Sequence, residues 1–265
     1  MKRSSGSTAR GPSHFDSARE PIVTPARVAR AAVLAAALTV SLAVGGLSAA
    51  CSRTDSAPVP AETRAVQTEP PAEQQASSEK PHIVFLGDSL TAGLGVAPDE
   101  AYPALIGRRL RASGFQYEVL NAGVSGDTSA AGLRRLEWSV KGPVEVLVVA
   151  LGANDGLRGL PVTELQRNLA TIIERARARH VAVLLAGMEA PPNFGAPYTE
   201  QFRAVYTALA NRYDVPLIPF FLEGVAGVPG LNQADGMHPN RAGHRAMADL
   251  VWRQLEPMLT SKHTQ

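Results

Sequence analysis

The sequence predicts an α/β domain in which a parallel five-stranded sheet is covered by helices on both faces. From residue 82 onward, short apolar runs alternate with segments of helical periodicity, which is typical of parallel sheets. Two of the runs are almost entirely apolar, as expected for strands that are buried on both faces. The five predicted strands are 83–86, 117–120, 144–150, 181–186 and 215–218.

The segments around these strands carry signals of helices and of a sheet edge. Apolar residues recur at helical spacing over 165–176 and 202–209, which predicts amphipathic helices there. A last helix is expected to begin near Pro239 and Asn240, because proline suits the first helical turn. Pro216 lies within the last apolar run, and proline cannot donate a hydrogen bond in a sheet, so this run is predicted to be an edge strand.

The first 50 residues have the pattern of an export signal. A basic stretch precedes 20 uncharged residues, 31–50, which end in small side chains. The residues that end at Cys51 resemble the lipobox of bacterial lipoproteins, although Ser48 stands where leucine is usual. The resemblance implies a lipid on Cys51 and a place in the bacterial cell envelope, facing the periplasm or the cell surface. The alternatives are plain secretion and an uncleaved anchor, because about 20 apolar residues can span a bilayer.

Residues 51–81 are predicted to be a disordered tether. The segment is rich in proline, has no aromatic residue, and contains only Val59 and Val66 as large apolar side chains. It therefore cannot bury enough surface to offset the entropy that is lost on ordering. We place the folded domain at 82–257 and a flexible tail at 258–265.

The charge and cysteine content exclude some partners and some means of stabilisation. Six of the 26 basic residues but only two of the 24 acidic residues lie in 1–50, so the rest of the chain is slightly acidic. A nucleic-acid-binding protein would instead carry a basic face, so we expect no nucleic-acid partner. Cys51 is the only cysteine, and no disulfide can form within the chain. The fold must therefore depend on its apolar core.

Several chemically useful residues follow the predicted strands. Parallel strands end at the same edge of a sheet, and ligands bind at that edge in open α/β folds. A serine follows the first strand, a glycine-rich turn the second, an amide the third, and an acid with a histidine the fifth. These residues are Ser89, Gly123, Asn154, Asp235 and His238.

A serine hydroxyl is a nucleophile only when a base removes its proton. Among the six histidines, only His238 lies in a loop at the predicted edge with an acid three residues before it. Asp235 can accept a hydrogen bond from one ring nitrogen and leave the other facing Ser89. Taken singly, each motif also fits ordinary structure, since Asp88 and Ser89 can cap a helix and Asp235 can form a turn.

A tetrahedral oxyanion also needs hydrogen-bond donors. The backbone N–H of Ser89, the backbone N–H of Gly123 and the side-chain amide of Asn154 are the candidates. Gly123 has no side chain to block the approach of a substrate. Turn chemistry alone would explain Gly123 and Asn154 individually, but their shared edge favours a catalytic role.

Four motifs in order resemble the sequence blocks of the SGNH (GDSL) hydrolases. They are Gly87-Asp88-Ser89-Leu90, Gly123, Gly152-Ala153-Asn154-Asp155 and Asp235-Gly236-Met237-His238-Pro239. The resemblance covers about 82–257. Segments 191–195 and 215–221 narrow it to the multifunctional bacterial acyl-CoA thioesterase, lysophospholipase and arylesterase branch.

The resemblance implies a flavodoxin-like three-layer α/β/α sandwich and a serine esterase that hydrolyses carboxylic esters and thioesters through an acyl-enzyme. It implies Ser89, Asp235 and His238 as the catalytic triad, with Ser89, Gly123 and Asn154 as the oxyanion hole. It also implies a small-molecule substrate, no metal and no organic cofactor. The resemblance further implies that one loop shapes the acyl pocket, and the substrate-binding residues expected in it are Pro192, Asn193 and Phe194.

Two other functions are compatible with parts of the sequence. An esterase of the same fold could remove acetyl groups from an envelope or plant polysaccharide, which a tethered enzyme would reach. A non-catalytic binding lipoprotein of flavodoxin-like fold is the second alternative. A phosphate or flavin site would need a glycine-rich loop after the first strand, where Asp88 would instead repel a phosphate.

Overall fold

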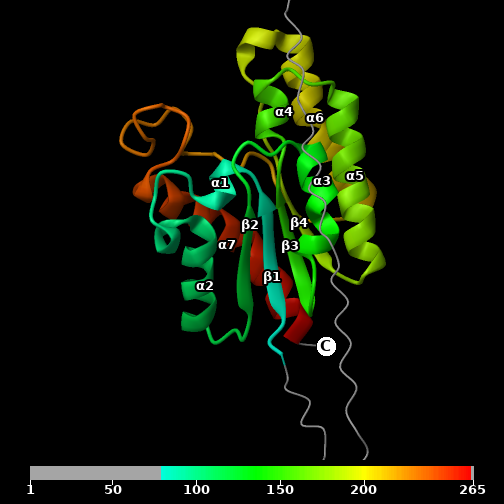
Figure 1. Ribbon diagram of the computed structural model, residues 1–265, viewed down its shortest axis with the longest axis vertical. Coiled ribbons are helices and arrows are strands. Elements are labelled where there is room, and N and C mark those ends of the chain that lie inside the picture. The colour runs from blue at the N-terminus through cyan, green and yellow to red at the C-terminus, as the bar shows by residue number, and fades with distance from the viewer. Residues whose placement is uncertain (1–78, 264–265) are drawn as a thin grey trace, which may run out of the picture. The chain divides into compact units, whose positions relative to one another are not determined.

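The computed structural model of the protein describes residues 79–263, which form an α/β domain (Figure 1). The predicted export signal, Cys51 and nearly all of the predicted tether lie outside the described residues. Within the part of the chain that is described, no helix is both long enough and apolar enough to cross a membrane.

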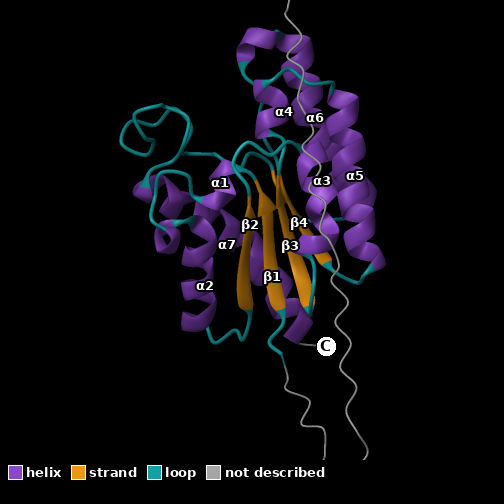
Figure 2. Cartoon of the chain, in the orientation of Figure 1, coloured by secondary structure: helices purple, strands orange, loops and turns teal. Residues whose placement is uncertain are grey.

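A five-stranded sheet with the strand order β2-β1-β3-β4-β5 lies at the centre of the domain (Figure 2). All neighbouring strands pair in parallel, so the carboxyl ends of the strands meet at one edge. This arrangement confirms the predicted sheet and the flavodoxin-like order of its strands. The strands are β1 (His82–Gly87), β2 (Glu118–Gly123), β3 (Val144–Ala150), β4 (Ala182–Ala186) and β5 (Leu217–Ile218).

Two strands differ from the prediction by more than one residue at an end. β2 continues three residues past the predicted end, to Gly123, which pairs with Gly87 of β1. β5 keeps only Leu217 and Ile218 of the predicted run. Pro216 contributes its carbonyl to the N–H of Leu185 at 2.9 Å but has no N–H of its own. As predicted, β5 lies at the edge of the sheet.

Helices cover both faces of the sheet (Figures 1 and 2). Helices α2 and α7 lie on one face, and α3, α5 and α6 lie on the other, which gives the predicted three layers. Two short helices, α1 and α4, follow β1 and β3 at the carboxyl edge. The bounds are α1 Ser89–Ala92, α2 Tyr102–Ala112, α3 Ser129–Ser139, α4 Ala153–Leu157, α5 Val162–Ala178, α6 Ala196–Tyr213 and α7 Arg241–His263, with 3₁₀ turns at Pro98–Glu100 and Pro192–Phe194.

The core lies between the sheet and these helices. Residues 83–86 of β1 and 146–149 of β3 have no exposed surface. The buried face of α5 consists of the residues whose spacing predicted it, among them Leu165, Leu169 and Ile172. Burying such side chains stabilises the fold by about 1.5–3 kcal/mol each, so the domain does not need a disulfide.

The last helix corrects the predicted carboxyl-terminal boundary. Asn240 caps α7 by accepting the N–H groups of Ala242 at 2.8 Å and Gly243 at 3.1 Å. The helix then continues through Pro257 to His263, and Leu259 is fully buried. The prediction of a flexible tail from 258 is therefore wrong as far as 263. Burial of Leu259, one helical repeat after Leu255, outweighs the hydrogen bond that Pro257 removes.

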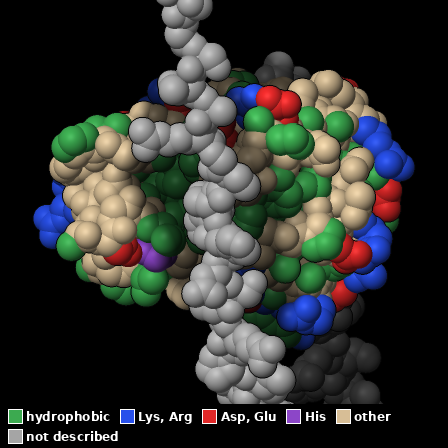
Figure 3. Space-filling model, turned by 90° about the horizontal axis from the view of Figure 1, so that it is seen from above, with side chains coloured by type: hydrophobic (Ala, Val, Ile, Leu, Met, Phe, Trp, Pro, Cys, Tyr) green, Lys and Arg blue, Asp and Glu red, His purple; other side chains and the backbone are tan. Residues whose placement is uncertain are grey.

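The carboxyl edge of the sheet carries the loops that hold the candidate site. Figure 3 views the domain from this side. Hydrophobic side chains gather there around a hollow beside a histidine, while most charged side chains lie toward the periphery.

Candidate active site

Ser89 lies in a tight turn between β1 and α1. Asp88 is 1% exposed and caps α1, because its Oδ1 accepts the N–H of Leu90 at 3.0 Å. Gly87 is required by close packing, since a Cβ there would lie 1.9 Å from Oγ1 of Thr91. Ser89 is the first residue of α1, so its own N–H is not used within the helix.

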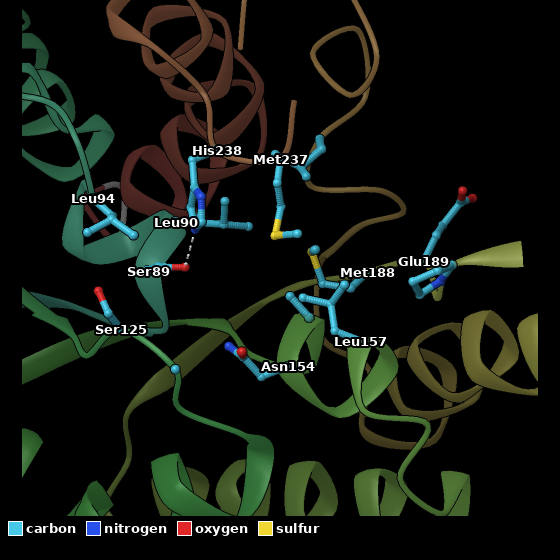
Figure 4. A pocket seen from close by; sticks show the side chains of 14 residues that line it. Ser89, Leu90, Leu94, Ser125, Asn154, Leu157, Met188, Glu189, Met237 and His238 are labelled. Atoms are coloured by element: carbon cyan, nitrogen blue, oxygen red, sulfur yellow. Dashed lines mark hydrogen bonds between the residues drawn. The ribbon is translucent and has the colours of Figure 1, made fainter. Parts of the chain in front are cut away.

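His238 and Asp235 reach Ser89 from the loop that precedes α7. The Oγ of Ser89 lies 3.0 Å from Nε2 of His238 (Figure 4). The Nδ1 of His238 lies 2.6 Å from Oδ2 of Asp235. An ionised carboxylate can only accept, so Nδ1 carries the proton and Nε2 is left to accept from the serine hydroxyl. The structure thus brings together the three residues of the predicted triad.

The carboxylate of Asp235 is fixed by three donors. Its Oδ1 accepts the N–H groups of Met237 at 2.9 Å and His238 at 3.0 Å, in addition to the ring contact on Oδ2. The backbone N–H of His238, followed by the ring of His238 and the N–H of Met237, lowers the pKa of Asp235 to about 2. Asp235 is therefore charged at neutral pH and can stabilise a protonated His238.

Asn154 faces Ser89 from the first turn of α4 (Figure 4). Its Nδ2 donates to the carbonyl of Asp127 at 3.0 Å and lies 3.4 Å from Oδ2 of Asp88. These contacts aim the amide at the space beside the Ser89 hydroxyl. The structure therefore places Asn154 where the sequence predicted it.

Gly123 does not lie at the site beside Ser89, where the sequence predicted it as an oxyanion donor. It is the last residue of β2, its N–H donates to Oδ1 of Asn121 at 2.9 Å, and it does not line the cavity beside Ser89. The assignment of Gly123 as an oxyanion donor is therefore wrong. Gly126, three residues later, lines the cavity instead and adopts a left-handed φ of 84°. A second glycine in the same loop, directly before Asp127, was the sequence signal for this position.

Two arginines that the sequence analysis missed hold the loop that contains Gly126. Arg135 of α3 donates through Nε to Asp127 at 2.6 Å and through Nη2 to the carbonyl of Gly87 at 2.8 Å. Arg158 donates through Nη2 to the carbonyl of Gly126 at 2.9 Å. Arg135 therefore connects the Gly126 loop to the end of β1, two residues before Ser89.

A buried polar network supports α4 from below. Asp155 is 2% exposed and accepts the N–H of Ser129 at 2.8 Å and its hydroxyl at 2.5 Å. Asn168 of α5 donates to the same hydroxyl at 3.0 Å. Burial is the main cause that raises the pKa of Asp155 above its usual value. The network fixes α4, and therefore Asn154, against α3 and α5.

A mainly apolar pocket of about 340 Å³ opens beside Ser89. Asn154 and His238 line its reactive end, and large apolar side chains line the rest. These apolar residues are Leu90, Leu94, Leu157, Met188, Leu222 and Met237. Such a pocket can hold an acyl chain with its carbonyl carbon next to the serine hydroxyl.

The loop after β4 contributes to this pocket through residues other than those predicted. Met188, Glu189 and Pro191 line the pocket. Pro192, Asn193 and Phe194 do not line it, so the structure does not place these predicted substrate-binding residues in the pocket beside Ser89. Phe194 instead packs on the ring of Tyr198, with the ring centroids 5.3 Å apart. Within residues 79–263, no three His, Cys, Asp or Glu side chains come together in a way that could hold a metal ion.

Comparison with known proteins decides the family. Residues 85–246 match the model of the GDSL-like lipase/acylhydrolase family. The chain belongs to this family. It is 46% identical over 187 residues to esterase TesA of Pseudomonas aeruginosa, a match that covers 70% of this chain and 92% of the relative. It is also 41% identical over 179 residues to thioesterase 1/protease 1/lysophospholipase L1 of Escherichia coli strain K12, covering 67% of this chain and 84% of the relative.

The solved structures agree with this assignment. A crystal structure of TesA matches with a TM-score of 0.64 and 45% identity over 67% of this chain and 99% of that chain. The family and its relatives establish an SGNH carboxylic ester hydrolase. They also confirm the thioesterase and lysophospholipase branch that segments 191–195 and 215–221 indicated.

Proposed function

We propose that this SGNH hydrolase cleaves carboxylic esters and thioesters of apolar acyl groups through an acyl-enzyme on Ser89. One observation carries the proposal. The chain from Ser89 Oγ through the His238 ring to Asp235, with contacts of 3.0 and 2.6 Å, stands at the inner end of an apolar pocket. A hydroxyl, a base and a fixed acid in this order are the parts that acyl transfer needs.

In the first step, Oγ of Ser89 attacks the carbonyl carbon while Nε2 of His238 takes its proton. Negative charge then develops on the carbonyl oxygen. The proposed donors to it are the N–H groups of Ser89 and Gly126 and the side-chain amide of Asn154, each of which contributes about 2.7–4 kcal/mol in well-studied cases. The tetrahedral intermediate collapses when the leaving alcohol or thiol takes the proton from His238.

In the second step, water replaces the leaving group. His238 removes a proton from the water, the hydroxide attacks the acyl-enzyme, and Ser89 recovers its proton as the carboxylic acid leaves. Asp235 stays ionised through both steps and keeps the Nδ1 proton of His238 in place. The protonated imidazole is therefore stabilised each time it forms.

The pocket favours acyl chains over acetylated sugars. Six large apolar side chains line it, and each methylene that they bury is worth about 0.8 kcal/mol. An acetyl group would leave most of this surface unused. The relative named thioesterase 1/protease 1/lysophospholipase L1 supports thioesters and lysophospholipids as the substrates to test first.

The test is ester hydrolysis by the purified Ser89→Ala variant. We expect the rate on p-nitrophenyl butyrate to fall by a factor on the order of 10⁴ or more, because the nucleophile is lost. Ser125→Ala is the matched control, since Ser125 also lines the pocket but does not contact His238. Retained turnover in Ser89→Ala, or an equal loss in Ser125→Ala, would refute Ser89 as the nucleophile.

We also propose export of the chain and lipid attachment at Cys51. The 20 uncharged residues before this cysteine and the lipobox-like residues that end at it support the proposal. Mass spectrometry of the mature amino terminus from bacterial membranes should find an acylated Cys51. A free amino terminus elsewhere, or a retained segment 1–50, would contradict it.

A further inference from the structure

Exposed apolar side chains are concentrated at one end of the domain. Among the described residues, seven large hydrophobic side chains are exposed, and six of them lie in the loops and short helical turns that follow the carboxyl ends of the strands. Each of the five segments that follow the strands contributes at least one. The six residues, called the apolar ring below, are Leu94, Val124, Leu157, Phe194, Val228 and Met237.

The seventh exposed residue shows how uneven this distribution is. Trp138 lies in the last turn of α3, whereas α3 begins at Ser129, next to the Gly126 loop. At 1.5 Å per residue, Trp138 is about 14 Å along the helix from that edge. Large apolar patches that rim a site usually mark a binding surface rather than chance exposure.

The apolar ring is continuous with the pocket. Leu94, Leu157 and Met237 are each 43–48% exposed and also line the pocket beside Ser89. Figure 4 shows these three side chains around the pocket opening, and Figure 3 shows hydrophobic surface gathered around the hollow. An acyl chain can therefore pass from the outer face to Ser89 along mainly apolar surface.

Several charged side chains on the same loops are engaged within the domain. Asp127 pairs with Arg135, Asp235 with His238, and Arg158 donates to the carbonyl of Gly126. These groups would therefore not be left without a partner if the apolar ring were covered by an apolar surface. Desolvating a paired charge costs less than desolvating a free one.

We propose that the apolar ring docks the pocket opening onto a lipid surface, from which single acyl chains enter the pocket without crossing water. The identity of the acyl substrate rests on the proposed function, but the docking itself does not. A protein seated on the ring would close the pocket opening, whereas a lipid surface covers the ring and supplies acyl chains through the same opening.

The sequence upstream of the domain supports a lipid surface as the partner. Residues 31–50 are uncharged and end at the lipobox-like Cys51. About 30 residues separate Cys51 from His82, and a chain of that length can reach roughly 100 Å when extended. A six-residue strand spans only about 20 Å. A chain held in a membrane at its amino terminus can therefore present the opposite end of the sheet to that membrane.

Vesicle flotation of residues 79–265 tests the docking apart from any amino-terminal anchor. This segment contains the whole core, and the solved TesA chain corresponds to 67% of this chain and 99% of its own length, so the domain folds without residues 1–78. The protein carries Ser89→Ala to prevent turnover. We expect it to float with neutral phosphatidylcholine vesicles.

Two variants separate the apolar ring from general hydrophobicity. Val124 and Val228 belong to the ring but do not line the pocket. We expect Val124→Asp/Val228→Asp to weaken vesicle partitioning by at least roughly tenfold. The matched control Trp138→Asp removes the most exposed hydrophobic side chain, which lies off the ring, and should leave partitioning unchanged. Val124→Ser/Val228→Ser should give a smaller loss and guards against misfolding of the charged variant.

Activity measurements with Ser89 intact complete the test. In Val124→Asp/Val228→Asp, hydrolysis of vesicle-embedded lysophosphatidylcholine should fall with partitioning, while soluble p-nitrophenyl butyrate should be cleaved within about twofold of the wild-type rate. A wild-type domain that does not float, or an equal loss in Trp138→Asp, overturns the docking proposal. Vesicle binding without hydrolysis of any ester would instead refute the proposed function and leave the docking intact.

Discussion

The side-chain amide of Asn154 lies 3.4 Å from the buried carboxyl of Asp88, the residue directly before the proposed nucleophile. Nδ2 of Asn154 has two hydrogens, and the second donates to the carbonyl of Asp127 at 3.0 Å. To donate to an oxyanion, Asn154 must therefore give up one contact, and the longer one to Asp88 is the weaker. In the proposed mechanism, Asp88 aims the amide when no substrate is bound and releases it when an oxyanion forms.

Burial of Asp88 costs stability at neutral pH. Burial is the main cause that raises the pKa of Asp88 to about 6, from an ordinary value of 3.8. The folded state therefore holds a proton that the unfolded state has lost between these two values. Stability from this group is highest below pH 3.8 and declines as the pH rises through about 6. The full cost amounts to about 3 kcal/mol at neutral pH.

Asp88→Asn should therefore raise stability and lower activity. Asn keeps the helix cap but removes the buried charge, so the free energy of unfolding should rise by up to about 3 kcal/mol near neutral pH and change little near pH 4. The kcat should fall by roughly 10- to 100-fold because the Asn154 amide is no longer aimed. Urea unfolding at both pH values and ester kinetics measure these effects. Asp249→Asn, an exposed acid, is the control, and a pH-independent gain in Asp88→Asn would contradict the assignment.

The acyl pocket predicts a dependence on chain length. If each added methylene is buried, kcat/KM should rise about fourfold per methylene until the pocket is filled, since about 0.8 kcal/mol corresponds to that factor. Leu157→Ser should flatten this rise, because Leu157 lines the pocket. Phe194→Ser is a matched control, since Phe194 is similarly exposed but lies outside the pocket. A series of soluble p-nitrophenyl esters measures the dependence of kcat/KM on acyl-chain length in both variants. Equal slopes in the two variants would show that the acyl chain does not lie in the pocket beside Leu157.

The sequence predicted that Ser89 and His238 lie together because this prediction needed only a topological rule. Ser89 and His238 are 149 positions apart, yet both follow predicted strands whose carboxyl ends must share one edge. The error at Gly123 arose from a strand boundary. The apolar run ended at 120, so Gly123 was assigned to a loop, whereas backbone pairing with β1 continues to Gly123. Backbone pairing with a neighbouring strand cannot be recognised from the local sequence where the paired residues are no longer apolar, as at residues 121–123.

The role of Arg135 and the lining of the pocket by the 191–195 loop could not be predicted for a related reason. Arg135 lies on an amphipathic helix among other charged residues, and nothing in its local pattern distinguishes it from the exposed Arg134. Its role depends on where α3 packs relative to β1. Similarly, the loop 191–195 was recognised, but the turn that directs Phe194 onto Tyr198 and leaves Pro191 in the pocket is set by tertiary packing.

Arg135 provides a last prediction, because one planar side chain donates to both Gly87 and Asp127. Lysine has a single nitrogen and cannot keep both contacts in this geometry. In Arg135→Lys, kcat should fall by roughly 10- to 100-fold with KM little changed, since Ser89 and Gly126 lose their relative placement while the pocket stays intact. Arg134→Lys, on the exposed side of α3, should match the wild type. A raised KM with unchanged kcat in Arg135→Lys would show that Arg135 shapes the pocket rather than aligning the reacting groups.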